Sequence, residues 1–313
     1  MFVPQQFPRT KDAQEIRLFI VGGSSIHNIG TADDLKARLQ NELRGTDKKI
    51  RIINISAGGY GTTRLRLHFQ EILDYAPDII LLYSGHNEFE EAYVRDKFFK
   101  DTALSALSDK LVEISKLYQF VNLLGIKTTQ SVLAQNIHLI ENRRHPFFPA
   151  NFRVNWDLTF DKNEVYKSYR MNIMQMVKLA KNNKIDMLIS TVTYNRRQPP
   201  FKAADDSYAV CDALHNQMDY QKALACFNDS LDADLQPHRA TKTSNTIVSD
   251  VAERFDVPLL DVDARIIEES QHHIPGFDLF YDHCHLGDEG NMMLQDVFFE
   301  GIRQTTTFSQ YLK

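Results

Sequence analysis

The residues best suited to chemistry lie near the end of the sequence, in the ten-residue stretch DHCHLGDEGN at positions 282–291. Its first four residues place a carboxylate, two imidazoles and a thiol together, at Asp282, His283, Cys284 and His285. These residue types fit a metal site, a polar surface loop, or the orienting acid and the base of a catalytic relay. Asp282 and His285 are three residues apart, a spacing that puts two side chains on one face of a helical turn. The carboxylate can then hold the Nδ1–H group of the imidazole and leave Nε2 as a base.

Such a base activates a serine hydroxyl, which is a poor nucleophile at its own pKa. Three polar, glycine-bearing turns occur early in the chain: GGSSIHN from Gly22, NISAGGYGTT from Asn54 and SGHNEF from Ser84. The first turn offers a serine, the second a glycine N–H group and the third a side-chain amide, which are groups that can bind an oxyanion. Each turn alone is weak support, because GGSS is more often a phosphate-binding or a plain tight turn. No Walker ending follows any of them, which disfavours a nucleotide site.

The elements that must position these turns follow from the hydrophobic pattern. Short apolar runs alternate with amphipathic stretches, which is typical of a parallel sheet with crossover helices. The predicted strands are 16–21, 49–54, 78–84, 185–192 and 257–262, and the predicted helices are 31–45, 62–76, 162–182 and 241–254. Ligands bind at the carboxyl ends of parallel strands, so we expect turns that are far apart in sequence to converge at one edge of a five-stranded sheet.

Two stretches do not fit this alternation, and we interpret both as insertions. Residues of about 90–160 combine helical periodicity with an aromatic, proline-bearing segment and contain no good strand. Residues of about 205–240 carry apolar side chains at helical spacing and look like the second helix of a tetratricopeptide unit. One half-unit cannot form a solenoid, so this second insertion either packs on the core or recruits a protein partner.

Composition narrows the classes of function. The chain has 313 residues, 36 basic and 41 acidic side chains and a net charge of −5, so we expect no nucleic-acid partner. Its three cysteines form no disulfide framework, although Cys211 and Cys226 could pair in an oxidising compartment. The compartment is left open. The chain has no spanning segment and is expected to be soluble as given, yet it starts so close to its first strand that an extracytoplasmic domain of a longer membrane-anchored protein also fits.

Taken together, four blocks of the sequence resemble the SGNH or GDSL hydrolase superfamily. They occur in the family's order: Gly22-Gly23-Ser24, then NISAGGYGT, then Gly85-His86-Asn87-Glu88, and finally Asp282 to His285. The resemblance spans about 260 residues. It implies a flavodoxin-like three-layer α/β/α sandwich with a five-stranded parallel sheet and helical insertions, built as a single domain over residues 1–313.

The resemblance also implies roles for individual residues. Ser24 is the expected nucleophile, His285 the base and Asp282 the residue that orients the imidazole. The expected oxyanion donors are the backbone N–H groups of Ser24 and Gly59 and the side-chain amide of Asn87. This chemistry uses no metal and no organic cofactor, and the metal interpretation of Asp282 to His285 leaves the serine, glycine and asparagine turns unexplained.

The sequence departs from the family pattern at two positions. Gly23 replaces the usual aspartate and Glu88 replaces the second acid of the third block, but both look like variants of a subgroup with GGSS and GHNEF blocks and a tetratricopeptide-like insertion before PHRAT. The adjacent Ser25 is an alternative nucleophile, which we reject because Ser24 holds the third place of its block. Candidate substrate-binding residues are His86, Glu88 and Arg239, and a structural hydrogen bond is an equal alternative for His86.

Three functions remain open on these residues. The leading one is a serine esterase or acylhydrolase that removes an acyl group from an ester, with a glycan as one candidate substrate. An O-acyltransferase would use the same triad with a sugar hydroxyl in place of water. The third is a non-catalytic module that binds a protein partner through the insertion at about 205–240.

Overall fold

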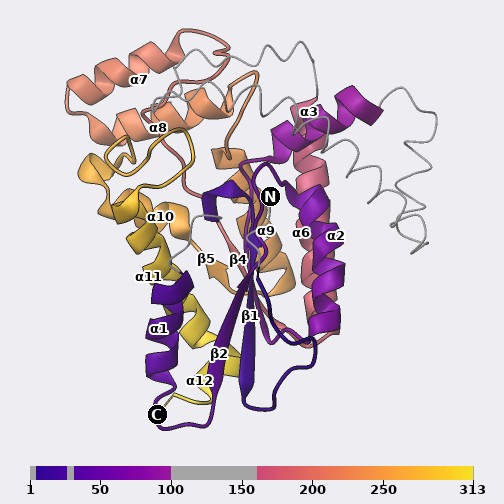
Figure 1. Cartoon of the computed structure of the whole chain (residues 1–313). Helices are drawn as coiled ribbons and strands as arrows, with labels where there is room; N and C mark the ends of the chain where they lie inside the picture. Colours follow the sequence, from indigo (N-terminus) through magenta and orange to yellow (C-terminus); the bar gives the residue numbers. More distant parts are fainter. Residues whose placement is uncertain (1–4, 27–31, 100–160, 313) are drawn as a thin grey trace, which may run out of the picture. The chain divides into compact units, whose positions relative to one another are not determined.

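The computed structural model describes residues 5–26, 32–99 and 161–312 (Figure 1). The chain divides into two compact units, one formed by residues 1–92 and 159–313 and the other by residues 93–158. Of the second unit only the end of helix α3 (Glu88–Phe99) is described, so most of the insertion expected at about 90–160 lies outside the described residues. The single-domain organisation stays a prediction, and the description below concerns the first unit.

The first unit is built on a five-stranded, entirely parallel sheet with the strand order β2-β1-β3-β4-β5. Its strands are β1 (Glu15–Gly22), β2 (Lys49–Asn54), β3 (Ile79–Tyr83), β4 (Asp186–Ser190) and β5 (Leu259–Leu260). All five lie within or next to the predicted strands, and the three-layer α/β/α prediction is confirmed. The last strand is much shorter than its apolar run.

Helices cover both faces of the sheet because successive side chains of a strand point to opposite faces. Leu18 and Ile20 of β1 face the core formed with α1 (Ala32–Glu42), α10 (Val262–Glu269), α11 (Asp288–Gln304) and α12 (Thr306–Ser309). Phe19 and Val21 face the core formed with α2 (Thr62–Ile72), α6 (Lys162–Asn182) and α9 (Lys242–Phe255). Figure 1 shows α1 and α11 on one side of the strands and α2 and α6 on the other.

The second expected insertion is a helical hairpin of α7 (Ser207–Asn216) and α8 (Tyr220–Asp232) (Figure 1). Its apolar side chains pack against each other and against Tyr194 and Ile274, and a disulfide between Cys211 and Cys226 joins the two helices. The hairpin therefore has a small core of its own beside the sheet. The resemblance to a tetratricopeptide unit gains no support from it, and a role in binding a partner stays a prediction.

Three short 3-10 turns complete the described elements: Ser24–Ile26, Leu73–Tyr75 and Gln271–His273. In residues 5–26, 32–99 and 161–312, no helix combines the length and the apolar character needed to cross a bilayer.

The disulfide leads to a simple prediction. When the protein is folded under oxidising conditions and then unfolded in guanidinium chloride without reductant, a thiol reagent should titrate only Cys284, since Cys284 is the free cysteine. After reduction all three cysteines of the chain should react. Three reactive thiols before reduction would show that the hairpin folds without the bond.

Candidate active site

Ser24, His285 and Asp282 form one hydrogen-bonded chain although 261 residues separate the serine from the histidine. Ser24 Oγ lies 2.9 Å from His285 Nε2, and His285 Nδ1 lies 2.7 Å from Asp282 Oδ2. With the proton on Nδ1 held by the carboxylate, Nε2 is the nitrogen that can accept the serine proton. The arrangement can therefore draw a proton from a hydroxyl group.

The loop that carries Asp282 and His285 is not the helical turn that the spacing suggested. Asp282 Oδ1 accepts the backbone N–H groups of Cys284 and His285, each at 2.8 Å, so the side chain closes a turn on its own backbone. Oδ2 is left to face the His285 ring. The predicted pairing of the two side chains is present, but an aspartate-capped turn produces it.

Burial and hydrogen bonding shift the pKa values of Asp282 and His285 in opposite directions. Burial raises the pKa of Asp282, but the hydrogen bond to His285 and the neighbouring imidazoles outweigh it and hold that pKa below its usual range. Burial lowers the pKa of His285, and the hydrogen bonds to Asp282 and Cys284 more than reverse this and raise it. The carboxylate is thus ionised, and the imidazole is a stronger base than an isolated histidine.

Ser24 is presented at the end of β1, where the strand stops at Gly22 and a 3-10 turn begins. The serine within hydrogen-bonding distance of the imidazole is Ser24, one residue before Ser25. Gly23 explains one departure from the family pattern, because a Cβ at this position would lie 2.3 Å from the amide nitrogen of Asn87. Glycine leaves room for that amide beside the serine.

Two of the expected oxyanion donors lie in turns that touch each other. The Asn87 amide nitrogen donates to the Tyr60 carbonyl at 3.1 Å, which uses one of its two N–H groups. Gly59 has a φ of 72°, the left-handed region that favours glycine, and a Cβ there would meet nothing within 4 Å. The glycine turn thus faces open space on the side where a side chain would stand.

The glycine turn is fixed by two acids of α3 that cap the start of α2. Glu88 accepts the Thr62 N–H at 3.0 Å and the Thr62 hydroxyl at 2.6 Å, and Glu91 accepts the Thr63 N–H at 2.9 Å. Gly61, which precedes α2, offers no side chain for this purpose. The unsatisfied N–H groups of a helix start need acceptors, and here another helix supplies them.

Arg64 extends this network to the proposed oxyanion glycine. Its guanidinium donates to Glu91 and to the Gly59 carbonyl, and it lies 4.2 Å from the centre of the Tyr60 ring. The network therefore connects the turn that carries Gly59 to the helix that begins next to Asn87.

The three candidate substrate-binding residues are all buried and bonded to the protein. His86 Nδ1 accepts the Ala240 N–H at 3.1 Å, which places the proton on Nε2. Burial and, to a smaller extent, repulsion from the neighbouring imidazoles lower the pKa of His86 to about 3. Glu88 caps α2 as described. Arg239 donates to the carbonyls of Asn195, Gln198 and Pro199 at 2.7, 2.9 and 2.7 Å. Contact of any of them with a substrate stays a prediction.

The metal interpretation can also be compared with the geometry. Ligand atoms of Asp282, His283 and Cys284 lie within 4.8 Å of one another. However, the Asp282 carboxylate already accepts three N–H groups, and burial raises the pKa of the Cys284 thiol. A metal ion on these three residues would compete with the N–H groups for the Asp282 carboxylate and would require deprotonation of the thiol, so these residues fit a metal poorly.

The sequence analysis missed Asn195, a fully buried asparagine in the segment after β4. Its side-chain amide and its backbone N–H bond the carbonyls of Asp282 and His283. A polar residue just past the end of a predicted strand was the available signal, the same one that singled out the first three turns.

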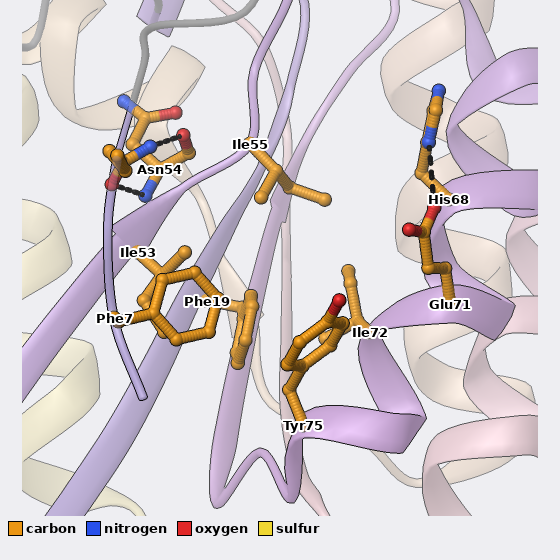
Figure 2. A pocket seen from close by; sticks show the side chains of 10 residues that line it. Phe7, Phe19, Ile53, Asn54, Ile55, His68, Glu71, Ile72 and Tyr75 are labelled. Carbon is orange, nitrogen blue, oxygen red and sulfur yellow. Dashed lines mark hydrogen bonds and ion pairs between the residues drawn. The ribbon is translucent and has the colours of Figure 1, made fainter. Parts of the chain in front are cut away.

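A separate hollow lies between the N-terminal segment, β2 and α2, and none of the predicted site residues lines it (Figure 2). Phe7, Phe19 and Tyr75 form part of its apolar wall, and His68 and Glu71 pair at 3.7 Å on one side. The hydrogen-bonded residues Ser24, His285 and Asp282 do not line this hollow.

No protein-family model matches the sequence, and no curated protein sequence matches it. Three of the solved structures similar to this chain are a GDSL-like lipase from Bacteroides thetaiotaomicron, the acetyl xylan esterase AlAXEase and a catalytic mutant of an acetylxylan esterase from Geobacillus stearothermophilus. Their identities are 11%, 13% and 12%, and their TM-scores are 0.44, 0.49 and 0.45. The alignments cover 92%, 92% and 94% of this chain and 88%, 100% and 96% of the others. At such identities the function has to be argued from this chain's own residues.

The cap on α2 predicts a pH-dependent stability. Burial and the charge of Glu91 raise the pKa of Glu88 from 4.5 to about 8. The stability that this proton provides is complete below pH 4.5 and is lost as the pH rises to about 8. Glu88→Gln removes this dependence. In urea unfolding between pH 4.5 and about 8, the free energy of unfolding of the variant should therefore rise relative to that of the wild type, by at most about 1.4 kcal/mol per pH unit.

Glu164→Gln is the control for this experiment, since Glu164 lies on the exposed start of α6. The unfolding of this variant is measured over the same pH range. A difference between Glu88→Gln and the wild type that is constant with pH would contradict the protonated cap.

Proposed function

We propose that the protein is a serine esterase that cleaves an acyl ester through an acyl-enzyme on Ser24. The proposal is carried by the continuous hydrogen bonding from Ser24 Oγ through His285 to Asp282, with contacts of 2.9 and 2.7 Å. A serine bonded to an imidazole that is itself oriented by a carboxylate is the arrangement that nucleophilic acyl transfer needs.

The reaction follows from these contacts. Ser24 Oγ bonds to the ester carbonyl carbon while its proton passes to His285 Nε2, and the carbonyl oxygen becomes an oxyanion. Breaking the ester C–O bond releases the alcohol, which takes the proton from His285 and leaves the acyl group on Ser24. Water then attacks the acyl carbon with His285 as base, so the carboxylic acid leaves and Ser24 is restored.

The oxyanion would be bound by the backbone N–H groups of Ser24 and Gly59 and by the Asn87 amide. The open space at Gly59 and the amide beside Gly23 support this assignment. Loss of one such donor in other enzymes typically slows the reaction about 100- to 1000-fold.

The substrate class that we propose is an acyl ester, with an acylated glycan as the first candidate. Product analysis with a sugar acceptor present distinguishes hydrolysis from acyl transfer, because water yields the free acid and a sugar hydroxyl yields a new ester.

A fluorophosphonate probe tests the nucleophile. Ser24 Oγ should displace fluoride from phosphorus, and intact mass should show one adduct per chain in the wild type. Ser24→Ala should abolish the adduct, and His285→Ala should slow its formation by orders of magnitude, because the serine loses its base. Ser25→Ala is the matched control and should label at nearly the wild-type rate. An adduct lost only in Ser25→Ala would move the nucleophile to that residue.

The raised pKa of His285 predicts the pH profile of hydrolysis. His285 must be neutral to accept the serine proton, so kcat/KM for a short acyl ester should rise with pH and reach half its maximum above pH 6.5, the ordinary histidine pKa. Asp282→Asn should lower kcat by about 10⁴-fold, as removal of the carboxylate does in other triads. It should also move the rising limb to lower pH. A limb that does not move in this variant would contradict the role of Asp282.

A further inference from the structure

Asn195 contacts the Asp282–His285 loop at two successive carbonyl groups. The segment that follows β4 leaves the sheet after Ser190 and runs past residues 282 and 283. Asn195 donates through its backbone N–H to the His283 carbonyl at 3.0 Å and through Nδ2 to the Asp282 carbonyl at 2.9 Å. One residue thus fixes the two successive peptide groups on either side of the His283 Cα atom.

The side-chain oxygen and the carbonyl oxygen of Asn195 also accept hydrogen bonds. Its Oδ1 accepts the backbone N–H groups of Arg197 and Gln198 at 2.9 and 3.1 Å, and its carbonyl accepts Arg239 Nη1 at 2.7 Å. The side chain is fully buried, as is Arg239 with 1% exposure. Each nitrogen and oxygen of Asn195 makes at least one hydrogen bond, and a buried polar group bonded in this way is costly to disturb, so Asn195 has one well-defined position.

The position of the Asp282 main chain determines where its carboxylate points. Oδ1 is used for the N–H groups of Cys284 and His285, and Oδ2 meets His285 Nδ1 only while the backbone of residues 282–285 keeps its turn. Release of the Asp282 and His283 carbonyls would allow that turn to rotate. A displacement of about 1 Å in a catalytic group can cost about 100-fold in rate.

We propose that Asn195 is a positioning residue of the active site, which holds the Asp282–His285 pair in register with Ser24 through the main-chain carbonyls of Asp282 and His283. The guanidinium of Arg239 donates to the Asn195 carbonyl and helps to fix the position of Asn195. The inference rests on the proposed esterase function. It gives the arginine of the PHRAT segment a place in the site that requires no contact with substrate.

Asn245 provides a matched control in the same region. It is also a buried asparagine, with 8% exposure, and its side chain bonds both the N–H and the carbonyl of Val192, at 2.9 and 3.0 Å. Its Nδ2 also donates to Asp263 at 3.1 Å. Its hydrogen bonds resemble those of Asn195 in number and type, but they do not reach the loop at 282–285.

The experiment compares Asn195→Asp with Asn245→Asp. Each substitution keeps the size of the side chain and retains Oδ1. The new oxygen faces the Asp282 carbonyl in Asn195→Asp, and the Val192 carbonyl and the Asp263 carboxylate in Asn245→Asp. Asn195→Asp should lower kcat for a short acyl ester by about 10- to 100-fold with little change in KM, and Asn245→Asp should leave kcat within about twofold of the wild type. Thermal unfolding of both variants shows whether their losses of stability are comparable.

A purely structural role of Asn195 would not lower the pKa of His285, and the charge of a carboxylate at position 195 would by itself raise it, so the direction of the shift in the pH profile is decisive. Loosening the contact with Asp282 weakens the interaction that raises the His285 pKa, and the rising limb of kcat/KM should move to lower pH only in Asn195→Asp. The groups that act on the His285 ring are Asp282, Cys284 and His283 on its own loop and Ser24 and His86 from other elements.

The proton on His285 Nδ1 gives a readout that needs no substrate. In the wild type and in Asn245→Asp it should give a far-downfield proton NMR signal that reports the bond to Asp282, and in Asn195→Asp this signal should shift upfield or broaden. If Asn195→Asp does not fold, Asn195→Ser serves in its place, since a hydroxyl on the shorter side chain cannot reach the Asp282 carbonyl.

Two failures can be told apart. A wild type that hydrolyses no ester and takes no fluorophosphonate overturns the proposed function, and the NMR comparison then still tests the contact with the loop. A wild type that is active, with an unchanged pH limb and an unchanged Nδ1 signal in Asn195→Asp, overturns the role of Asn195 and leaves the esterase proposal standing.

Discussion

The Asp282 carboxylate accepts three N–H groups, and the arrangement of the site depends on all three bonds being made together. Two come from the backbone of Cys284 and His285 and close the local turn, and the third comes from the His285 ring. Because the first two fix the side chain, the third can form only with the imidazole in one orientation, with Nε2 toward Ser24. An ionised carboxylate that is partly buried needs such donors to remain charged. The same bonds that stabilise the loop therefore orient the base.

The rest of the first unit brings distant segments to this loop. Parallel strands place their carboxyl ends at one edge of the sheet, so Ser24 after β1, Gly59 after β2 and Asn87 after β3 converge there. Helix α3 adds a second kind of constraint, because Glu88 and Glu91 cap α2 in place of Gly61 and hold the glycine turn close to the Asn87 turn. The serine, the imidazole and the proposed oxyanion donors thus derive their positions from backbone contacts as much as from each other.

Much of this was predictable because its signals are local. Apolar runs of strand length located all five strands. Polar, glycine-bearing turns just beyond three of them marked the candidate site, and the resemblance of the sequence blocks to a known family singled out Ser24, Gly59 and Asn87 within these turns. The pairing of Asp282 with His285 followed from residue type and spacing, although the turn between them is non-helical. Asn195 also stands just past a predicted strand, but its role could not be assigned, because its partners are main-chain carbonyls of which the nearer is 87 residues away, and no residue type shows which carbonyls it meets. The cap formed by Glu88 was missed for a similar reason, since its acceptor role depends on a helix start 26 residues earlier.

The central claim is that Ser24 attacks an acyl carbon while Gly59, Asn87 and the Ser24 backbone bind the resulting oxyanion. A crystal structure of the fluorophosphonate adduct tests it most directly, because the tetrahedral phosphorus imitates the intermediate. If Ser24 is the nucleophile, phosphorus should be bonded to Ser24 Oγ and a phosphoryl oxygen should lie about 2.7–3.1 Å from the three nitrogen donors, with His285 still bonded to Asp282. An adduct on another residue, or a phosphoryl oxygen turned away from Gly59 and Asn87, would contradict it.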